Sequence, residues 1–550
     1  MQLSGNILNL FDRTIRYGQL LIEQGRIYEI VEWGDERPGQ PYILPGFVDA
    51  HVHIESSLLT PTQFARLAVV HGTVATVSDP HEIGNVLGIR GVEYMIEDSR
   101  RVPFKFWFGA PSCVPATTFE TAGASIGVRE VRQLLGMKEI GYLAEMMNFP
   151  GVLHADPDVM TKLALAKAFN KPIDGHAPGL RGDEAQTYMD AGITTDHECF
   201  TYEEGFDKAT RGMNILIREG SAARNFEALI PLLADFPQQI MFCSDDKHPD
   251  TLVEGHIDRL VVRALAKGHD RFDVLRAACL NPVLHYRLPA GLLREGDPAD
   301  FIVVSDLQTF RIQQTVINGH VVAENGRSNL PDLRSPHVNQ FAATPVKPDD
   351  FRVEARHVGE WVRVIEALDG QLITNELHVE LPTENGVVLT DVEQDVLKLV
   401  VVNRYQPSVP AVAFIRNFGL KHGAIASSVG HDSHNITAVG CDDESIARAV
   451  NRVIEAKGGL SAVGRGPSPV AHLLPLPVAG LMTDADGYEV ARLYADLDRF
   501  AKRELGSTLA APFMTLSFMA LLVIPNLKLS DKGLFDGRTF RFVASYLSER

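Results

Sequence analysis

The chain has 550 residues, more than one hydrophobic core usually holds, so roughly two to four domains are expected. Its formal net charge of −18 at pH 7 disfavours nucleic acid as a partner, because such a surface repels phosphate groups. Hydrophobic and charged contents of 45% and 22% are typical of a globular protein, and no segment has the pattern of a signal peptide or membrane span, so we expect a cytoplasmic protein without a membrane partner.

Two separated segments carry the pattern of short β-strands. Residues 1–42 alternate short apolar and polar runs, as in GQLLIEQGRIYEIVEWG, which is typical of small antiparallel strands. Residues 288–330, which contain GDPADFIVVSDLQTF, return to short strands separated by Gly and Asp turns. We therefore predict one small β-sandwich-like domain that is built from both segments.

Between these segments, residues 43–287 alternate apolar strands with helix-length stretches about every 20–35 residues. Eight strands are predicted, with the sequences FVDAHVH, TVATVSDP, KFWFGAPSC, IGYLAEMM, KPIDGHAP, GITTDHEC, MNILIREGS and QQIMFCSDD. Eight such units in about 200 residues are typical of a (β/α)8 TIM-like barrel, so the chain is assigned to the α/β class.

The rest of the chain is predicted to hold a linker and a further domain. Residues 330–350, LPDLRSPHVNQFAATPVKPDD, are rich in proline and weakly periodic, which is typical of a linker. Residues 351–550 have the pattern of a C-terminal mixed α/β domain. The most apolar run of this domain, Phe513–Pro525, is too short to span a bilayer.

Ionisable residues gather at the C-terminal ends of the predicted strands, where barrels of this kind carry their catalytic groups. His51 and His53 end the first strand, and alternate residues of a strand share a face, so their imidazoles are expected side by side. The other residues at strand ends are Asp79, His81, Glu145, His176, His197 and Asp245. The sequence therefore predicts that side chains from separate elements meet near one axis.

Each of these residues alone has an ordinary structural interpretation. A histidine such as His176 is often a hydrogen-bonded structural residue, Asp245 could cap the following helix, and Asp79 could cap a turn. Together, six of these residues indicate a metal site: His51, His53, His176, His197, Glu145 and Asp245. Their N and O atoms suit Zn, Mn or Fe(II). This set exceeds the needs of one tetrahedral ion and is sufficient for two ions that share a bridging carboxylate and a bridging hydroxide.

The segment GHDSHN places His431 and His434 close together in the C-terminal region. Its His-x-x-His spacing could bind a metal on a turn or short helix. The segment could also close the site as a loop over the barrel mouth, or be a surface turn rich in Asp, Ser and Asn. The spacing by itself leaves these three interpretations open.

Motifs that resemble known families are spread over almost the whole chain. The stretches PGFVDAHVHIES, CSDD and NPVLHYRLPAGLLREGDPADFIVV are similar to the amidohydrolase superfamily. More narrowly, the chain resembles the adenine deaminase family in VSDPHEIGNVLG, AEMMNFPGV, DGHAPGL, TTDHEC, SVGHDSHNI, LPLPVAGLMTD and PFMTLSFMALLVIPNLKLSDKGLFD. The C-terminal stretches are the more specific evidence, because His-x-His alone is evidence only for the superfamily.

The resemblance implies two divalent metal ions as cofactors, Mn²⁺ or Fe²⁺ rather than Zn²⁺. The implied ligands are His51, His53 and Asp245 for one ion, His176 and His197 for the other, and Glu145 as a bridge between them. It also implies that the residues near the substrate are Asp79, His81, His431 and His434. Residues 351–550 would be the adenine-deaminase-type domain.

The implied reaction is hydrolytic deamination of adenine to hypoxanthine and ammonia, a step of purine salvage. A metal-bound hydroxide would attack C6, and Asp245 would carry the proton to the departing amine. Glu145 or Asp79 would protonate N1. A homodimer or larger homo-oligomer is expected, because large barrel enzymes are commonly symmetric.

Two other functions compete with this one. The first is an amidohydrolase that acts on another aminated heterocycle or on a cyclic amide. The resemblance disfavours the cyclic amide, because the fourth strand, YLAEMM, has a glutamate where many two-metal members carry a carboxylated lysine. The second is a non-catalytic scaffold. Such proteins typically lose metal ligands, and none of the expected ligands is missing from this sequence.

Overall fold

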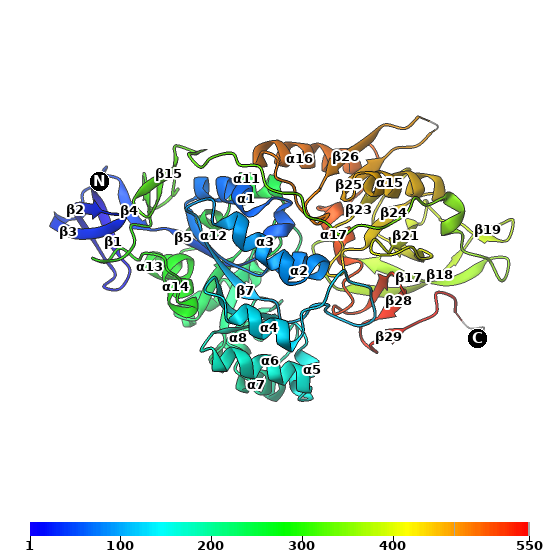
Figure 1. Ribbon diagram of the computed structural model, residues 1–550, viewed down its shortest axis with the longest axis horizontal. Coiled ribbons are helices and arrows are strands. Elements are labelled where there is room, and N and C mark those ends of the chain that lie inside the picture. Colours follow the sequence, from blue (N-terminus) through cyan, green and yellow to red (C-terminus); the bar gives the residue numbers. More distant parts are fainter. Residues whose placement is uncertain (467, 548–550) are drawn as a thin grey trace.

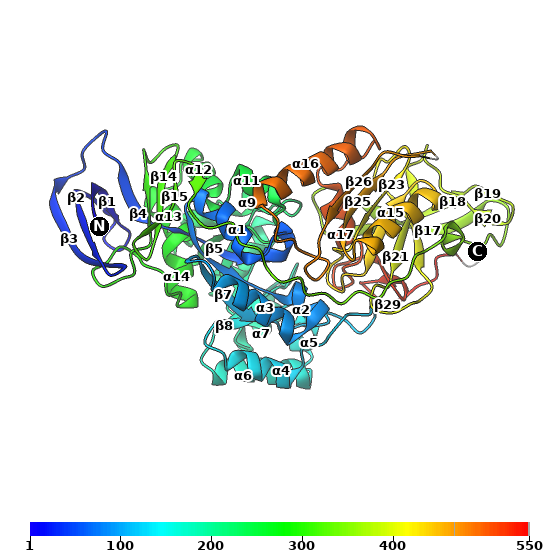
Figure 2. The same ribbon diagram turned by 45° about the horizontal axis from the view of Figure 1, so that its top comes forward.

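The computed structural model describes residues 1–466 and 468–547. Its parts lie along one long axis, with a small β-sheet near the N-terminus at one end and a larger α/β region at the other (Figure 1). Eight parallel strands with surrounding helices lie between them (Figure 2). The site described below lies where these strands face the larger region.

The small sheet combines strands from both sides of the central region, in the order β16-β15-β14-β13-β4-β1-β2-β3. Its strands are β1 (Gln2–Asn9), β2 (Thr14–Glu23), β3 (Arg26–Asp35), β4 (Tyr42–Pro45), β13 (Phe301–Val304), β14 (Ile312–Ile317), β15 (His320–Glu324) and β16 (Arg327–Ser328). The sheet is continuous because β4 pairs with β1 on one side and with β13 on the other. Ile7, Ile43 and Phe301 belong to its apolar core.

All eight strands expected in the central region are present. They are β5 (Phe47–Val52), β6 (Thr73–Ser78), β7 (Lys105–Ala110), β8 (Ile140–Met146), β9 (Ile173–Gly175), β10 (Thr195–Asp196), β11 (Asn214–Arg218) and β12 (Ile240–Cys243). They form one sheet of β5–β9 and another of β10–β12, and all pairs are parallel. β9 contacts β10, and a parallel bridge joins Val52 to Asp245, so the strands form a closed ring.

Helices surround this ring because their apolar faces need burial. α12 (Ile257–Ala266) shows the pattern, since Ile257, Leu260, Val261 and Ala264 recur at helical spacing and are buried. The other helices of the region are α1 (Pro61–Ala68), α2 (His81–Leu87), α3 (Ile89–Ser99), α4 (Val128–Leu135), α5 (Phe149–Leu153), α6 (Pro157–Ala168), α7 (Gly182–Asp190), α8 (Tyr202–Thr210), α9 (Phe226–Leu229), α10 (Leu232–Asp235), α11 (Pro249–Glu254), α13 (Arg271–Leu275) and α14 (Asn281–Tyr286).

The C-terminal region begins after residues 329–347, which form no helix or strand. Its eight-stranded sheet has the order β18-β17-β22-β21-β24-β23-β25-β26, with strands β17 (Glu360–Ala367), β18 (Thr374–Leu381), β21 (Val396–Val402), β22 (Ala411–Arg416), β23 (Ala424–Ser427), β24 (Ile436–Gly440), β25 (Gly459–Val463) and β26 (Ala471–Pro475). The smaller strands are β19 (Thr383–Glu384), β20 (Val387–Val388), β27 (Leu527–Ser530), β28 (Gly533–Asp536) and β29 (Arg541–Phe542). Its helices are α15 (Asp443–Glu455), α16 (Gly487–Arg503) and α17 (Pro512–Phe518).

The C-terminal region packs over the ring at the C-terminal ends of the strands. In both views α17 lies between the ring and the C-terminal sheet (Figures 1 and 2). The apolar run that contains α17 is buried in this position, from Phe513 to Leu522. Within the described residues, no helix combines the length and hydropathy that crossing a membrane requires.

Candidate active site

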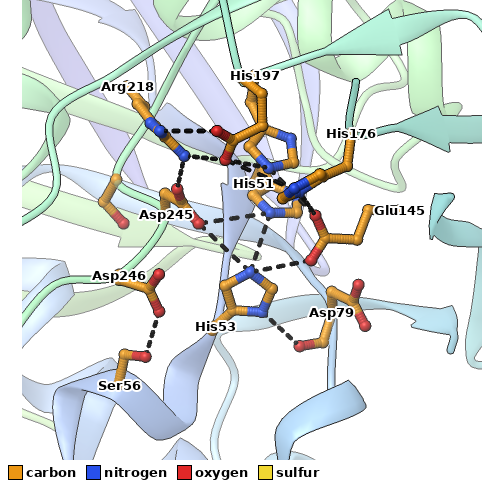
Figure 3. A network of polar contacts seen from close by, with 12 residues as sticks. His51, His53, Ser56, Asp79, Glu145, His176, His197, Arg218, Asp245 and Asp246 are labelled. Atoms are coloured by element: carbon orange, nitrogen blue, oxygen red, sulfur yellow. Dashed lines mark hydrogen bonds and ion pairs between the residues drawn. The ribbon is translucent and has the colours of Figure 1, made fainter. Parts of the chain in front are cut away.

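Seven of the eight ring strands deliver polar side chains to the same edge, because parallel strands all end there. These side chains are His51, His53, Asp79, His81, Glu145, His176, His197, Arg218 and Asp245, and all of them are buried. Figure 3 shows that His51, His53, His176, His197, Glu145 and Asp245 point toward one another from the ends of different ring strands. The ligand set expected from the sequence is therefore gathered in one place.

The first group consists of His51, His53 and Asp245. The Nε2 atoms of the two histidines are 3.2 Å apart. Asp245 Oδ1 lies 3.7 Å from His51 Nε2 and 3.3 Å from His53 Nε2. Atoms that bind one tetrahedral ion at about 2.1 Å are about 3.4 Å from each other, so this spacing fits a shared cation.

Glu145 connects this group to His176 and His197. Its Oε2 lies 2.7 Å from His176 Nδ1 and 3.2 Å from His197 Nε2. Its Oε1 lies 3.4 Å from His53 Nε2. The two oxygens of one carboxylate therefore face two groups of imidazoles, which is the geometry of a bridging ligand.

The orientation of the rings leaves nitrogen lone pairs free for a cation. His53 Nδ1 lies 3.2 Å from the backbone oxygen of Asp79, so its N–H donates there in the neutral tautomer. Its Nε2 then presents a lone pair to Asp245 and Glu145. The ring of His51 stacks on His197 with centroids 4.0 Å apart, which fixes the two groups relative to each other.

Beneath the site, Asp49 fixes the end of β5 against the end of β12. Asp49 Oδ1 accepts a hydrogen bond from the N–H of Ser244 at 2.9 Å, and Oδ2 accepts one from the Ser244 hydroxyl. His256 Nε2 lies 2.8 Å from the same Oδ2. In addition, the Asp245 N–H donates to the backbone oxygen of His51 at 2.9 Å, so the first group is held by both strands.

A second buried network holds the loops that carry His176 and His197. Lys208 is fully buried, and its Nζ donates to the carbonyl oxygen of the residue after His176 at 2.7 Å. The same Nζ contacts Asp196 and donates to Glu204 at 2.8 Å. Asp196 Oδ1 accepts hydrogen bonds from the N–H groups of the residues that follow His176 and His197. One lysine thus positions both histidine loops.

The cavity at this edge is lined by six carboxylates and five histidines. Its carboxylates are Glu82, Glu145, Glu198, Asp245, Asp246 and Asp432. Among the described residues that line it, Arg218 is the one Lys or Arg. Arg218 donates to Asp245 at 2.6 Å and to Glu198 at 3.0 Å. Buried carboxylates in this number need further positive charge, which divalent cations would supply.

The electrostatics of the described side chains keep the central carboxylates ionised. Burial opposes ionisation of Glu145, but the imidazole of His176 and then that of His197 hold its pKa well below the usual range. Burial likewise opposes ionisation of Asp245, and the Arg218 guanidinium holds the pKa of that carboxyl well below the usual range. Both carboxylates are thus in the form that binds a metal ion.

The GHDSHN segment lies at the site and not on the surface. His431 and His434 are buried, and His431 Nδ1 and His434 Nε2 each contact one carboxylate oxygen of Glu82 in α2. Phe518 stacks on His431, with ring centroids 4.7 Å apart. The segment is therefore a buried loop at the ring edge and not a surface turn.

His81 and Asp79 occupy different positions around the cavity. His81 lines the cavity, with Nδ1 3.4 Å from Glu145 Oε1 and Nε2 3.7 Å from Asp432 Oδ1. Asp79 is absent from the cavity wall, because its Oδ1 accepts the N–H of His81 at 3.1 Å and its Oδ2 lies 3.2 Å from His81 Nδ1. Asp79 therefore lies next to a residue of the cavity wall, and its role near the substrate stays a prediction.

Three ionisable residues of the cavity wall were not identified from the sequence: Glu198, Arg218 and Asp246. Glu198 and Asp246 each directly follow an expected ligand, and that adjacency was the available signal. Arg218 ends the apolar strand β11, where a lone arginine predicts a buried ion pair. Glu82 directly follows His81, but its partners His431 and His434 are distant in sequence.

Comparisons with known proteins give sequence matches over nearly the whole chain. The Amidohydrolase family profile matches residues 42–322, and the adenine deaminase C-terminal domain profile matches residues 371–541. The adenine deaminase of Salinibacter ruber is 56% identical over 546 residues, and that of a Sulfurovum species is 57% identical over 545 residues; each alignment covers 99% of both chains. The solved structure of N-acetyl-D-glucosamine-6-phosphate deacetylase from Mycobacterium smegmatis aligns with 59% of this chain and 100% of its own, at a TM-score of 0.45 and 17% identity.

Proposed function

The chain belongs to the adenine deaminase family, and from this premise we propose that its buried His/carboxylate cluster is a two-metal centre on a (β/α)8 barrel. The activity is hydrolytic deamination of adenine, which gives hypoxanthine and ammonia. We further propose that Mn²⁺ or Fe²⁺ is the native metal and that the reaction serves purine salvage. Imidazole and carboxylate ligands without thiolates suit both ions.

The position of Glu145 carries this proposal, because its two oxygens face separate groups of imidazoles. The proposed ligands of one ion are His51, His53 and Asp245, and those of the other are His176 and His197, with Glu145 shared. Ions bound there would lower the pKa of a water molecule and so supply a nucleophile at neutral pH.

Asp245 is our proposed proton carrier. Its Oδ1 faces His51 and His53, while its Oδ2 is held by Arg218 at 2.6 Å. This pairing keeps the carboxylate ionised and fixes its direction. In the reaction, Asp245 takes a proton from the attacking water and passes it to the departing amino group.

The proton for N1 is assigned to the pair formed by Glu82 and His431. The sequence suggested two donors, Asp79 and Glu145. Asp79 accepts a hydrogen bond from the N–H of His81, and each oxygen of Glu145 contacts an imidazole. Glu82 lines the cavity and contacts His431 directly. Burial opposes protonation of His431, yet the Glu82 carboxylate raises its pKa to about 9, so a proton is held between the two groups at neutral pH.

The purine itself would be recognised mainly by the C-terminal region. The apolar side chains of the cavity wall are Met147, Leu372, Phe518 and Leu521, and three of these four come from that region. A flat aromatic base needs apolar contact on its faces and polar partners at its edges. His81 and His431 are the polar partners we propose, with His434 acting through Glu82.

The remaining proposals concern the whole molecule. We propose domains at residues 1–42 with 288–330, 43–287 and 351–550, and a homodimer or larger homo-oligomer as the working form. A cytoplasmic location is supported by the five cysteines, which are all buried and unpaired.

The proposal is tested with protein expressed under iron chelation and manganese supply. Adenine absorbance, ammonia release and metal content are then measured on the same sample. Loss of adenine with stoichiometric ammonia and two ions per chain would support it. Full turnover with a single bound ion would overturn the two-metal assignment, and ring opening of a cyclic amide in place of deamination would overturn the substrate.

A further inference from the structure

Three apolar side chains from the C-terminal region form a roof over the cavity. They are Leu372, Phe518 and Leu521, and none is more than 5% exposed. The cavity between this roof and the ring edge has a volume of about 30 Å³, small beside the roughly 300–1,000 Å³ of typical ligand pockets. A purine that enters the cavity must therefore displace or press against the roof.

Lys528 in β27 is attached to two parts of this roof. Its side chain is fully buried, and Nζ donates to the backbone oxygen of Leu372 at 2.6 Å and to that of Phe518 at 3.0 Å. Leu372 and Phe518 are far apart in sequence and lie on separate segments. Through its amine, one side chain thus joins both segments.

The environment of Lys528 differs from that of an ordinary buried lysine. Among the described residues, no carboxylate lies within ion-pair distance of its Nζ, and burial lowers its pKa to about 7. A neutral amine has two N–H donors, which the two carbonyl oxygens satisfy. Loss of the amine would leave both oxygens buried without a partner, and both segments would be free to shift.

The roof also contacts the pair formed by Glu82 and His431. The ring of Phe518 stacks on that of His431, and the backbone N–H of His431 donates to the backbone oxygen of Ser517 at 3.0 Å. A shift of the segment that ends in Phe518 would therefore displace His431, which lines the cavity. A shift of Leu372 would likewise change the apolar part of the cavity wall.

We propose that Lys528 is a positioning residue for substrate binding, which holds Leu372 and Phe518 where their side chains contact the face of a purine. It does not contact the reacting atoms. Apolar contacts to the faces of a base are made equally in the ground state and in the transition state. Their loss should therefore raise KM more than it lowers kcat.

The test compares Lys528→Met with Lys398→Met in the manganese-loaded enzyme. Lys398 is a suitable control, because it is also buried in the C-terminal region and donates to a backbone oxygen, that of Phe351 at 2.9 Å, as well as to Asp443. For Lys528→Met we expect KM for adenine to rise about tenfold with a much smaller change in kcat. Both variants should bind the same amount of metal as the wild type.

An unchanged KM in folded, metal-loaded Lys528→Met would overturn the proposal, as would an equal rise of KM in Lys398→Met. Should Lys528→Met fail to fold, Leu372→Ala tests the same roof by truncating the side chain itself. An unchanged KM in that variant would also overturn the proposal. Failure of the proposed two-metal centre would be seen separately, as a low metal content of the wild type.

Discussion

Glu82 in α2 and His434, which is 352 residues further along the chain, are in direct contact through Oε2 and Nε2. The other oxygen of the same carboxylate contacts His431. The contact is fully buried, so removing either partner would leave an unpaired polar group in the interior. The ring and the C-terminal region therefore both contribute side chains to the proposed active site.

Glu82→Gln should lower kcat for adenine by about 10²–10⁴-fold, the usual contribution of a positioned acid or base. Glutamine keeps the volume of the side chain but cannot share a proton with His431. Steady-state kinetics and metal analysis of the same preparation provide the measurement, and two ions per chain should remain bound. Near-wild-type turnover of this variant would remove Glu82 from the reaction.

Lys208→Met should weaken the metal affinity of the group that contains His176 and His197 by about 10–100-fold, the usual effect of losing an outer partner of metal ligands. The group of His51 and His53 is held by Asp49 and should keep its ion. Dialysis against graded chelator should then remove one ion at lower chelator concentration than the other.

Lys171→Met is the matched control for this experiment, because Lys171 also donates to backbone oxygens, those of Leu135 at 2.6 Å and Met137 at 3.3 Å. These contacts lie away from both histidine loops. Simultaneous loss of both ions from Lys208→Met, or an equal loss from the control, would show that Lys208 does not act on one group selectively.

Much of this arrangement could be predicted because it depends on local patterns. His51-x-His53 at the end of an apolar strand gave both the element and the direction of two ligands. Glu145 and Asp245 followed from the rule that parallel strands end at one edge. The eight strands were likewise visible as apolar runs at regular intervals.

The parts that sequence could not supply depend on tertiary contacts. The sequence allowed Asp79 either to cap a turn or to lie near the substrate, and the turn after β6 brings its carboxylate to His81. Lys528 lies in a short apolar strand and carries no motif. Its contacts with the backbone oxygens of Leu372 and Phe518 form only in the folded chain.

The stability contributed by Lys528 should depend on pH. Its folded pKa is about 7, whereas an unfolded lysine has a pKa of about 10.4. Between these values the unfolded chain binds more protons, so the free energy of unfolding rises with pH, by up to about 1.4 kcal/mol per pH unit. Below pH 7 the group is protonated in both states and this dependence ends.

Urea unfolding of the wild type and Lys528→Met at pH 7.5 and 9 isolates this contribution. The difference in unfolding free energy between wild type and variant should increase by roughly 2 kcal/mol over that interval. Other titrating groups cancel in the comparison. Parallel behaviour of the two proteins would mean that Lys528 stays charged in the folded state.

Removal of metal should abolish deamination and destabilise the ring. A ligand at one hundred times its dissociation constant stabilises the folded state by about 2.7 kcal/mol per site. Thermal unfolding of the apoprotein should therefore occur at a lower temperature and recover as Mn²⁺ is added, with activity returning over the same titration. Full activity after one equivalent of Mn²⁺ would contradict the two-ion assignment.

Asp245→Asn should lower kcat by about 10²–10⁴-fold while at least one ion stays bound. The asparagine can still place an oxygen toward His51 and His53, but it cannot accept the proton of the attacking water. It also leaves Arg218 with Glu198 as its remaining carboxylate. Asp250→Asn is a suitable control, because Asp250 lies in α11 outside the cavity wall. Near-normal turnover by Asp245→Asn with metal bound would show that the proton is carried by another group, and Asp246, on the same cavity wall, would then be the next residue to substitute.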